Sequence, residues 1–124
     1  MDITPVIARD RQLITGYGGG GFKINHQYIA GSLLVLPAMS MAWNVSSDTP
    51  LAVSHFSKIL EQTSGIELLL VGTGSVMKPL DISVTTALKQ AGIAVETMDT
   101  GAACRTFNVL LGEERKVAAA LIAV

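Results

Sequence analysis

The sequence has few charged residues and almost no cysteine, and each shortage excludes a class of site. Among its 124 residues nine are basic and ten are acidic, which gives a formal net charge of −1. Binding to the phosphates of nucleic acid needs a basic surface that this composition does not supply. The single cysteine, Cys104, cannot form an internal disulfide, and a zinc site normally takes several cysteine or histidine ligands. We therefore expect no nucleic-acid partner, no metal and no cofactor.

The sequence also lacks a long apolar run of the kind that crosses a membrane. The stretch between Lys23 and Asp48 carries no formal charge, but amides, serines and Pro37 interrupt it. A membrane-spanning helix needs about 20 mainly apolar residues. The first residues show no basic segment followed by an apolar one, which is the pattern of a secretory signal. We expect no membrane span and a cytoplasmic location.

The first half of the chain has the patterns of β-strands. From Phe22 to Tyr28 apolar or aromatic residues alternate with polar ones, the period of a half-buried strand that includes His26. Residues 31–37 form an apolar run that is too short for a helix and ends at a proline, so they predict a core strand. A further strand is expected over residues 39–45. These strands should pair in an antiparallel arrangement.

In the second half, strand and helix patterns alternate. Residues 46–50 offer capping side chains and a proline suited to a first helical turn, so a helix should follow them. The apolar run 66–71 predicts a strand buried on both faces, as in parallel sheets. The expected elements are helix 52–60, strand 66–71, a helix from Asp81 or Ser83 to Ala91, strand 93–98, helix 103–111 and strand 117–122.

This order predicts an α/β fold over residues 1–124 as a single domain. Its N-terminal part is antiparallel, and its C-terminal part runs β-α-β-α-β-α-β with right-handed crossovers over a mostly parallel sheet. The expected core includes Leu34, Leu36, Leu69, Val71, Val95, Phe107 and Leu121.

Two glycine-rich segments resemble loops that bind phosphate. Residues 16–21 match G-x-G-x-x-G, but that motif binds pyrophosphate where a helix follows it, and here a strand follows. A turn between strands is favoured. The segment Gly72-Thr73-Gly74-Ser75 leaves the end of a strand, where α/β sheets form their crevices. It is a structural turn, a loop that binds an anion or small ligand, or a dinucleotide site. The dinucleotide site is disfavoured, because Met77 takes the place of the third glycine, Lys78-Pro79 delays the helix, and Glu96, which would bind the ribose, falls in mid-strand.

Polar residues also follow the next strand along the chain, and their loop should neighbour the Gly72 loop. They either cap the following helix and pair with one another, as Asp99 could with Arg105, or form a polar pocket. The candidate ligand-binding residues are Gly72, Thr73, Gly74, Ser75, Asp99, Thr100, Arg105 and Asn108.

No residue has the setting of a catalytic group. Cys104 starts a predicted helix beside Arg105, which favours a thiolate, but no histidine has a claim to act as its base. A buried cysteine is usually an inert apolar residue. His26 and His55 are expected to pack or to face solvent. We predict no catalytic residues and lean against an enzyme.

Three segments together resemble a known family. They are 96–100 (Glu-Thr-Met-Asp-Thr), 103–110 (Ala-Cys-Arg-Thr-Phe-Asn-Val-Leu) and 115–121 (Arg-Lys-Val-Ala-Ala-Ala-Leu). The chain resembles the small, largely uncharacterised α/β family that includes assembly factor 3 of mitochondrial respiratory complex I and the adipogenesis-associated domain proteins. That resemblance implies a mixed sheet folded on itself with helices on its flank, and no established reaction.

The sequence therefore leaves two alternative hypotheses for the function. The resemblance implies a non-enzymatic module that acts through contacts with another protein. The alternative is a small-molecule or anion-binding protein, with or without enzymatic activity, that uses the Gly72 loop and residues 99–108. A cleft that joins Thr73, Asp99 and Arg105 would favour the alternative, whereas an exposed apolar patch would favour the first.

Overall fold

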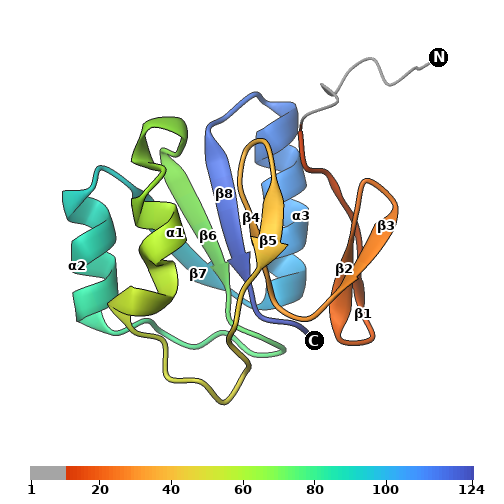
Figure 1. Ribbon diagram of the computed structural model, residues 1–124, viewed down its shortest axis with the longest axis horizontal. Coiled ribbons are helices and arrows are strands. Elements are labelled where there is room, and N and C mark those ends of the chain that lie inside the picture. Colours follow the sequence, from red (N-terminus) through yellow and green to blue (C-terminus); the bar gives the residue numbers. More distant parts are fainter. Residues whose placement is uncertain (1–10) are drawn as a thin grey trace.

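The computed structural model describes residues 11–124, and these form two β-sheets flanked by helices (Figure 1). One sheet is antiparallel, with the order β1-β2-β3, and the other has the order β5-β4-β8-β6-β7. The strands are β1 (Ile14–Gly18), β2 (Gly21–Ile24), β3 (Gln27–Ala30), β4 (Leu33–Val35), β5 (Ser40–Ala42), β6 (Leu68–Gly72), β7 (Ala94–Met98) and β8 (Val117–Leu121). The helices are α1 (Ser57–Leu60), α2 (Ile82–Gln90) and α3 (Thr100–Gly112), with 3₁₀ turns η1 (Val53–Phe56) and η2 (Thr63–Gly65).

The mixed α/β fold expected from the sequence is confirmed. Strand β6 pairs in parallel with both β7 and β8, whereas β4 pairs antiparallel with β5 and β8. The antiparallel N-terminal part is divided between the sheets, because β1–β3 form the small sheet while β4 and β5 extend the large one. The large sheet therefore has its parallel strands at one end and its antiparallel strands at the other.

The large sheet carries a hydrophobic core on each face. On one face, Leu34, Leu69 and Val71 pack with residues of α1 and α2. On the other face, α3 and the small sheet pack together over the strands. Strand β8 lies between β4 and β6 and is buried along its whole length, so its alternate residues contribute to both cores. Its short alanine side chains at 118–120 suit a strand covered on both faces.

The predicted core is largely confirmed. Leu34, Leu36, Leu69, Val71, Phe107 and Leu121 are buried. Val95 is only partly buried, because β7 is an edge strand with a neighbour on one side. Trp43 is also buried, and its ring meets Phe56 edge to face at 5.5 Å.

The single strand expected over residues 22–28 was wrong, because a two-residue hairpin turn divides it. Asn25 and His26 both have positive φ, 51° and 72°, as a type I′ turn requires. His26 is consequently exposed at the turn rather than placed on a buried face. The turn predicted within residues 16–21 is confirmed, since Gly19 and Gly20, at φ 63° and 83°, join β1 to β2 in the same way.

The helix expected over residues 52–60 was also wrong in form. The segment is a 3₁₀ turn followed by the four residues of α1, and its N-cap is Ala52 rather than a residue of 46–49. The polar side chains there close a turn of their own, in which Ser46 N donates to Thr49 Oγ1 and Thr49 N donates to Ser46 O. Phe56 and Ile59 are nevertheless buried.

Candidate functional site

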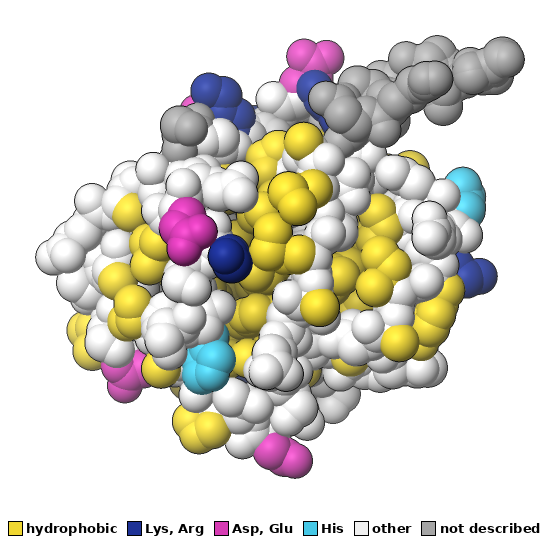
Figure 2. All heavy atoms as spheres, viewed as in Figure 1, with side chains coloured by type: hydrophobic (Ala, Val, Ile, Leu, Met, Phe, Trp, Pro, Cys, Tyr) yellow, Lys and Arg dark blue, Asp and Glu magenta, His cyan; other side chains and the backbone are white. Residues whose placement is uncertain are grey.

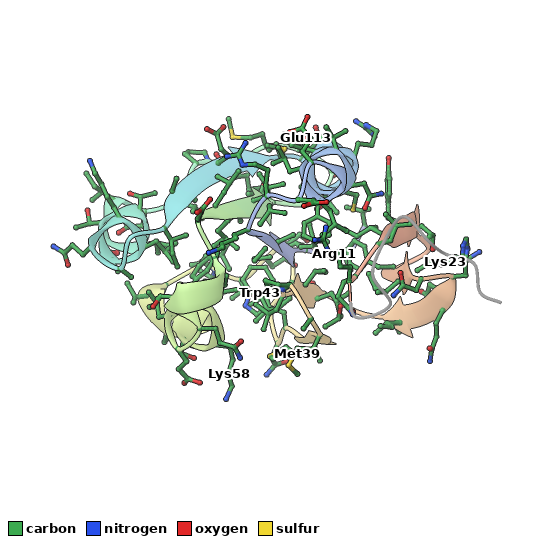
Figure 3. The ribbon with its side chains drawn as sticks, turned by 90° about the horizontal axis from the view of Figure 1, so that it is seen from above. Arg11, Lys23, Met39, Trp43, Lys58 and Glu113 are labelled. Carbon is green, nitrogen blue, oxygen red and sulfur yellow. The ribbon has the colours of Figure 1, made fainter. Side chains whose placement is uncertain are left out.

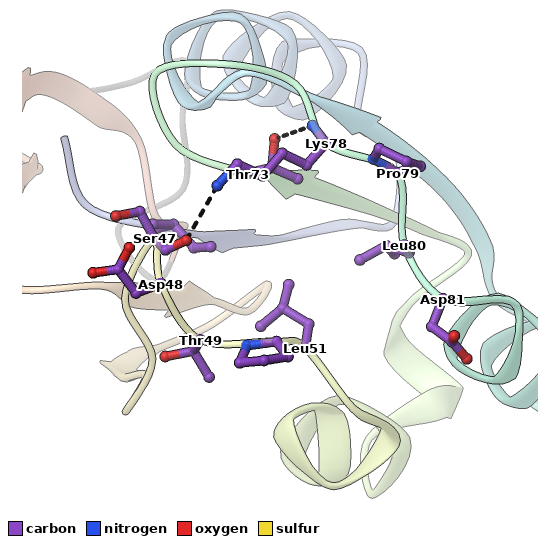
Figure 4. Close-up of a pocket in the computed structure, with 11 residues that line it drawn as sticks. Ser47, Asp48, Thr49, Leu51, Thr73, Lys78, Pro79, Leu80 and Asp81 are labelled. Carbon is purple, nitrogen blue, oxygen red and sulfur yellow. Dashed lines mark hydrogen bonds between the residues drawn. The ribbon is translucent and has the colours of Figure 1, made fainter.

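A surface groove of about 550 Å³ lies at the carboxyl ends of β6 and β8 (Figure 4). Two connecting segments form its walls, residues 47–51 before η1 and residues 78–81 before α2. Thr73, just after β6, and Ile122, just after β8, complete the lining. This is the edge of a parallel sheet at which α/β proteins commonly build their crevices.

The groove carries charges of both signs above an apolar lining. The Lys78 ammonium donates to the Ser47 carbonyl at 3.2 Å and so ties the two walls together. Asp48 and Asp81 add two exposed carboxylates. Asp81 caps α2, and hydrogen bonds from the side chain and the backbone of Ser83 hold the pKa of its carboxyl below the usual value. With one ammonium and two carboxylates, the groove is not selective for anions.

The buried hydroxyl of Thr73 holds the loop that follows β6. Its Oγ1 donates to the Val76 carbonyl at 2.8 Å and accepts from the Lys78 backbone N at 2.9 Å. These bonds shape residues 73–78 into the turn that carries Lys78 to the groove. Thr73 therefore acts first as a structural residue.

The Gly72 loop and the start of α3 lie against each other, as the sequence predicted. A Cβ on Gly72 would stand 2.9 Å from the Thr100 Cα, so only glycine permits this approach. Gly74 N donates to Thr100 Oγ1 at 2.9 Å, and that hydroxyl donates to the Ile122 carbonyl at 2.7 Å. Thr100 thus joins the ends of β6 and β8 to the first turn of α3. Ser75 is exposed on the same loop.

The other candidate residues do not reach the groove. Asp99 caps α3 by accepting from Ala102 N at 2.9 Å. Arg105 does not pair with Asp99; its guanidinium donates to the Tyr17 hydroxyl at 2.8 Å. Asn108 binds the backbone of Ile14. Arg105 and Asn108 therefore face the small sheet, and ligand binding by the full set of candidates stays a prediction.

Cys104 is buried against the small sheet and the large one, with 2 % of its surface exposed. Desolvation raises the pKa of its thiol to about 12, and the nearby positive charge of Arg105 offsets only part of that effect. The thiol is protonated at neutral pH and is not activated as a nucleophile. His55 is also used by the fold, since its Nδ1 accepts from Ala52 N at 2.9 Å.

Within residues 11–124, no group of three or more His, Cys, Asp or Glu side chains is placed to hold a metal ion. Within the same residues, no helix is both long enough and apolar enough to cross a membrane.

Sequence reasoning did not identify either wall of the groove. Residues 46–50 have the pattern of a helix start, and residues 78–80 lie between a predicted strand and a predicted helix without a feature of a binding site. Each wall contains a proline, Pro50 and Pro79. Small polar residues make up much of the first wall and precede the second. Two such segments ahead of consecutive helices are the signal that could have pointed to paired walls at one edge of the sheet.

The family described as "Protein of unknown function (DUF498/DUF598)" matches residues 14–122. The chain belongs to this family. The resemblance found in the sequence is confirmed, because a Danio rerio protein named NADH dehydrogenase [ubiquinone] 1 alpha subcomplex assembly factor 3 is 42% identical over 89% of this chain and 63% of its own length. The Homo sapiens protein of the same name is 39% identical over 93% of this chain and 62% of its own length.

The chain therefore spans less than two thirds of the length of these two DUF498/DUF598 relatives. It spans more of an uncharacterised protein from Rhodobacter capsulatus, which is 33% identical over 88% of this chain and 82% of its own length.

Solved structures of similar proteins have the same fold. A Bartonella henselae protein titled an outer membrane protein superposes with a TM-score of 0.85 at 39% identity, over 92% of this chain and 96% of its own. A Bordetella pertussis protein titled a Mth938-like domain gives a TM-score of 0.82 at 26% identity, over 98% of this chain and 92% of its own. The DUF498/DUF598 chain thus has a Mth938-like fold.

Proposed function

We propose that this DUF498/DUF598 chain is a non-enzymatic protein-interaction module that acts as an assembly factor. The observation that carries the proposal is its identity of about 40% to assembly factors over most of its length. By analogy with their names, the proposed client is a subunit of an NADH dehydrogenase. The alternative drawn from the sequence, a small-molecule or anion-binding protein, is not proposed, because no comparison supports it.

The chemistry of the described residues supports a binding role over a reaction. The polar groups that the sequence offered as candidates, such as Thr100 and Asn108, serve as caps and braces within the fold. The one thiol is buried and protonated. A catalytic site needs a nucleophile or base within hydrogen-bond reach of a reacting atom. Thr73, Thr100 and His55 are committed to structural bonds here.

The surface of the described residues gives a second line of support for the proposal, because it carries large apolar side chains. Figure 2 shows hydrophobic side chains gathered over β5 and over the small sheet. Methionine and tyrosine are enriched at protein interfaces, where they supply contact area. Among residues 11–124, the exposed large hydrophobic residues are Tyr17, Tyr28, Met39, Val76, Met77, Ile82 and Val109.

Affinity purification from the native cells tests the proposal. A tagged chain at its natural level should recover NADH dehydrogenase subunits, identified by mass spectrometry, that the tag alone does not recover. Cells without the chain should accumulate incomplete enzyme on native gels, and re-expression should restore the complete form. Recovery of no subunit, together with normal enzyme in the deleted cells, would contradict the proposal. Fractionation of the same cells checks the predicted cytoplasmic location.

A further inference from the structure

We infer that the outer edge of β7 is the surface to which a partner adds an extended, basic β-strand. The inference rests on the proposed function, because it assumes a protein partner, and it names how that partner is bound. Figure 3 shows β7 along the outer side of the large sheet, between α2 and α3. The strand pairs with β6 alone, in unbroken register over residues 94–98.

The backbone groups of Val95 and Thr97 point away from the sheet. Ala94 N donates to Glu67 O at 3.0 Å, and Met98 O accepts from Thr73 N at 2.9 Å, so both residues face the β6 side. Successive residues of a strand point their N–H and C=O groups to opposite sides. Val95 and Thr97 therefore present two donors and two acceptors along the open edge, the row that an added strand pairs with.

A groove of about 490 Å³ runs beside this edge and has room for the side chains of an added strand. Thr85 and Lys89 of α2 line one side of it, and residues 92–95 line the other. Side chains on the added strand that lie opposite Val95 would enter the groove, because directly opposed residues share a face of the sheet. Met77, which is 52 % exposed and receives a weak hydrogen bond from the Thr97 hydroxyl, adds apolar surface at the far end.

The negative charge of Glu96 favours one kind of strand at this edge. Glu96 lies between Val95 and Thr97 in the strand. Its side chain is exposed on the face of the strand opposite to that of Val95. If two copies paired antiparallel about Glu96, their carboxylates would stand directly opposite each other, which is destabilising. A lysine or arginine at that position is favourable. The structure thus selects a partner segment with the pattern apolar, basic, apolar.

The edge strands β1 and β5 are less suited to strand addition, and the remaining edge strand of the described residues, β3, is shorter than β7, with four residues. On β1, the side chain of Asn108 already binds both backbone groups of Ile14. Strand β5 has three residues, and its Ser40 hydroxyl donates to Gln12. Strand β7 has five residues in register and contains no lysine or proline, the residues that commonly protect an edge. The five residues of β7 therefore present the more complete template.

Peptide titration of the ¹⁵N-labelled chain tests the inference. The probe is the acetylated and amidated peptide Ser-Thr-Val-Lys-Val-Thr-Ser, and its control has glutamate in place of lysine. We expect saturable amide shifts at residues 92–98, with affinity for the control peptide about threefold to tenfold weaker. Equal affinity for the two peptides, shifts centred on another edge, or no shifts at millimolar peptide would overturn the inference.

Two variants sharpen the test. Thr97→Pro removes an outward N–H without breaking a bond to β6, so the protein should fold and lose peptide binding. Glu96→Lys should reverse the preference between the peptides, whereas Glu61→Lys, the same charge change at the C-cap of α1, should not. If Thr97→Pro abolished a concentration-dependent self-association instead, the occupant would be a second copy and the inference would fail. If Thr97→Pro left the recovery of NADH dehydrogenase subunits unchanged, the edge would be excluded while the proposed function stood.

Discussion

The side-chain amide of Asn108 binds both backbone groups of Ile14. Its Oδ1 accepts from Ile14 N at 2.9 Å, and its Nδ2 donates to Ile14 O at 2.6 Å. A residue of α3 therefore takes the place of a neighbouring strand at the edge of β1. Tyr17, further along β1, lies over Gly101 and accepts from Arg105, so the small sheet is held to α3 at both ends of the strand.

Replacement of Asn108 by alanine should lower the free energy of unfolding by about 1 to 3 kcal/mol, because two partly buried backbone groups lose their partner. Denaturant titration measures the loss, and hydrogen exchange at the Ile14 amide should accelerate. The control is Val109→Ala at the exposed neighbouring position, which should change stability by less than about 0.5 kcal/mol. Equal effects of the two changes would show that the bonds to Ile14 do not hold the small sheet.

Leu69→Ala should cost about 2 to 5 kcal/mol, since the side chain is fully buried in the core shared by β6, α1 and α2. Ile82→Ala removes apolar carbons from a side chain that is 78 % exposed and serves as the comparison. Urea denaturation of both variants gives the difference. A loss below about 0.5 kcal/mol for Leu69→Ala would mean that the position tolerates a cavity that packed cores do not.

Gly72→Ala should destabilise the fold by about 1 to 3 kcal/mol, because the new methyl group would press on the backbone of Thr100. Gly112→Ala is the matched control, since a Cβ there meets no atom within 4 Å and its φ is not positive. That change should be neutral or slightly stabilising. Thermal unfolding of the two variants separates them, and a Gly72→Ala protein as stable as the parent would contradict the tight contact between β6 and α3.

Stability should fall at alkaline pH because of Cys104. The pKa of the buried thiol is about 12 in the folded chain, against 9.0 for an ordinary cysteine, so the unfolded chain releases its proton first. The contribution is complete below pH 9 and is lost as pH rises toward 12. By pH 10 the loss should be on the order of 1 kcal/mol relative to Cys104→Ala, measured as the difference between the two denaturation curves. Native Cys104 should also react slowly with thiol reagents at pH 7, and rapid labelling would show that the thiol is accessible.

The sequence predicted best those elements whose residue pattern fits only one type of secondary structure. Residues 66–71 are apolar without alternation, which fits a strand covered on both faces, and β6 is such a strand. The pattern at 22–28 fits either one strand or a hairpin of two strands. Alternation alone did not reveal that Asn25 and His26 take up left-handed conformations. The polar cluster at 46–49 could cap a helix or close its own turn, and the second outcome depends on contacts that local pattern does not contain.

The candidate site was predicted only where a rule of topology applied. Parallel strands end at the same edge, so Gly72 and Thr100 were expected to meet, and they do. Arg105 and Asn108 were expected beside them but face the small sheet. Nothing in the spacing of residues 14–30 tells on which side of α3 that sheet will pack. The walls of the groove were missed for the same reason, since their pairing is set by tertiary contacts.

The place of β8 in the large sheet has a consequence for how the protein is made. Of the strands in that sheet, β8 is the last to leave the ribosome, yet it lies between β4 and β6 and joins the antiparallel part to the parallel part. Until residues 117–121 have been synthesised, the sheet exists as two unconnected pieces with apolar edges and faces. Neither core can close over a missing central strand. Completion of the large sheet is therefore coupled to the synthesis of residues 117–121, and the apolar edges of β4 and β6 that pair with β8 stay open until then.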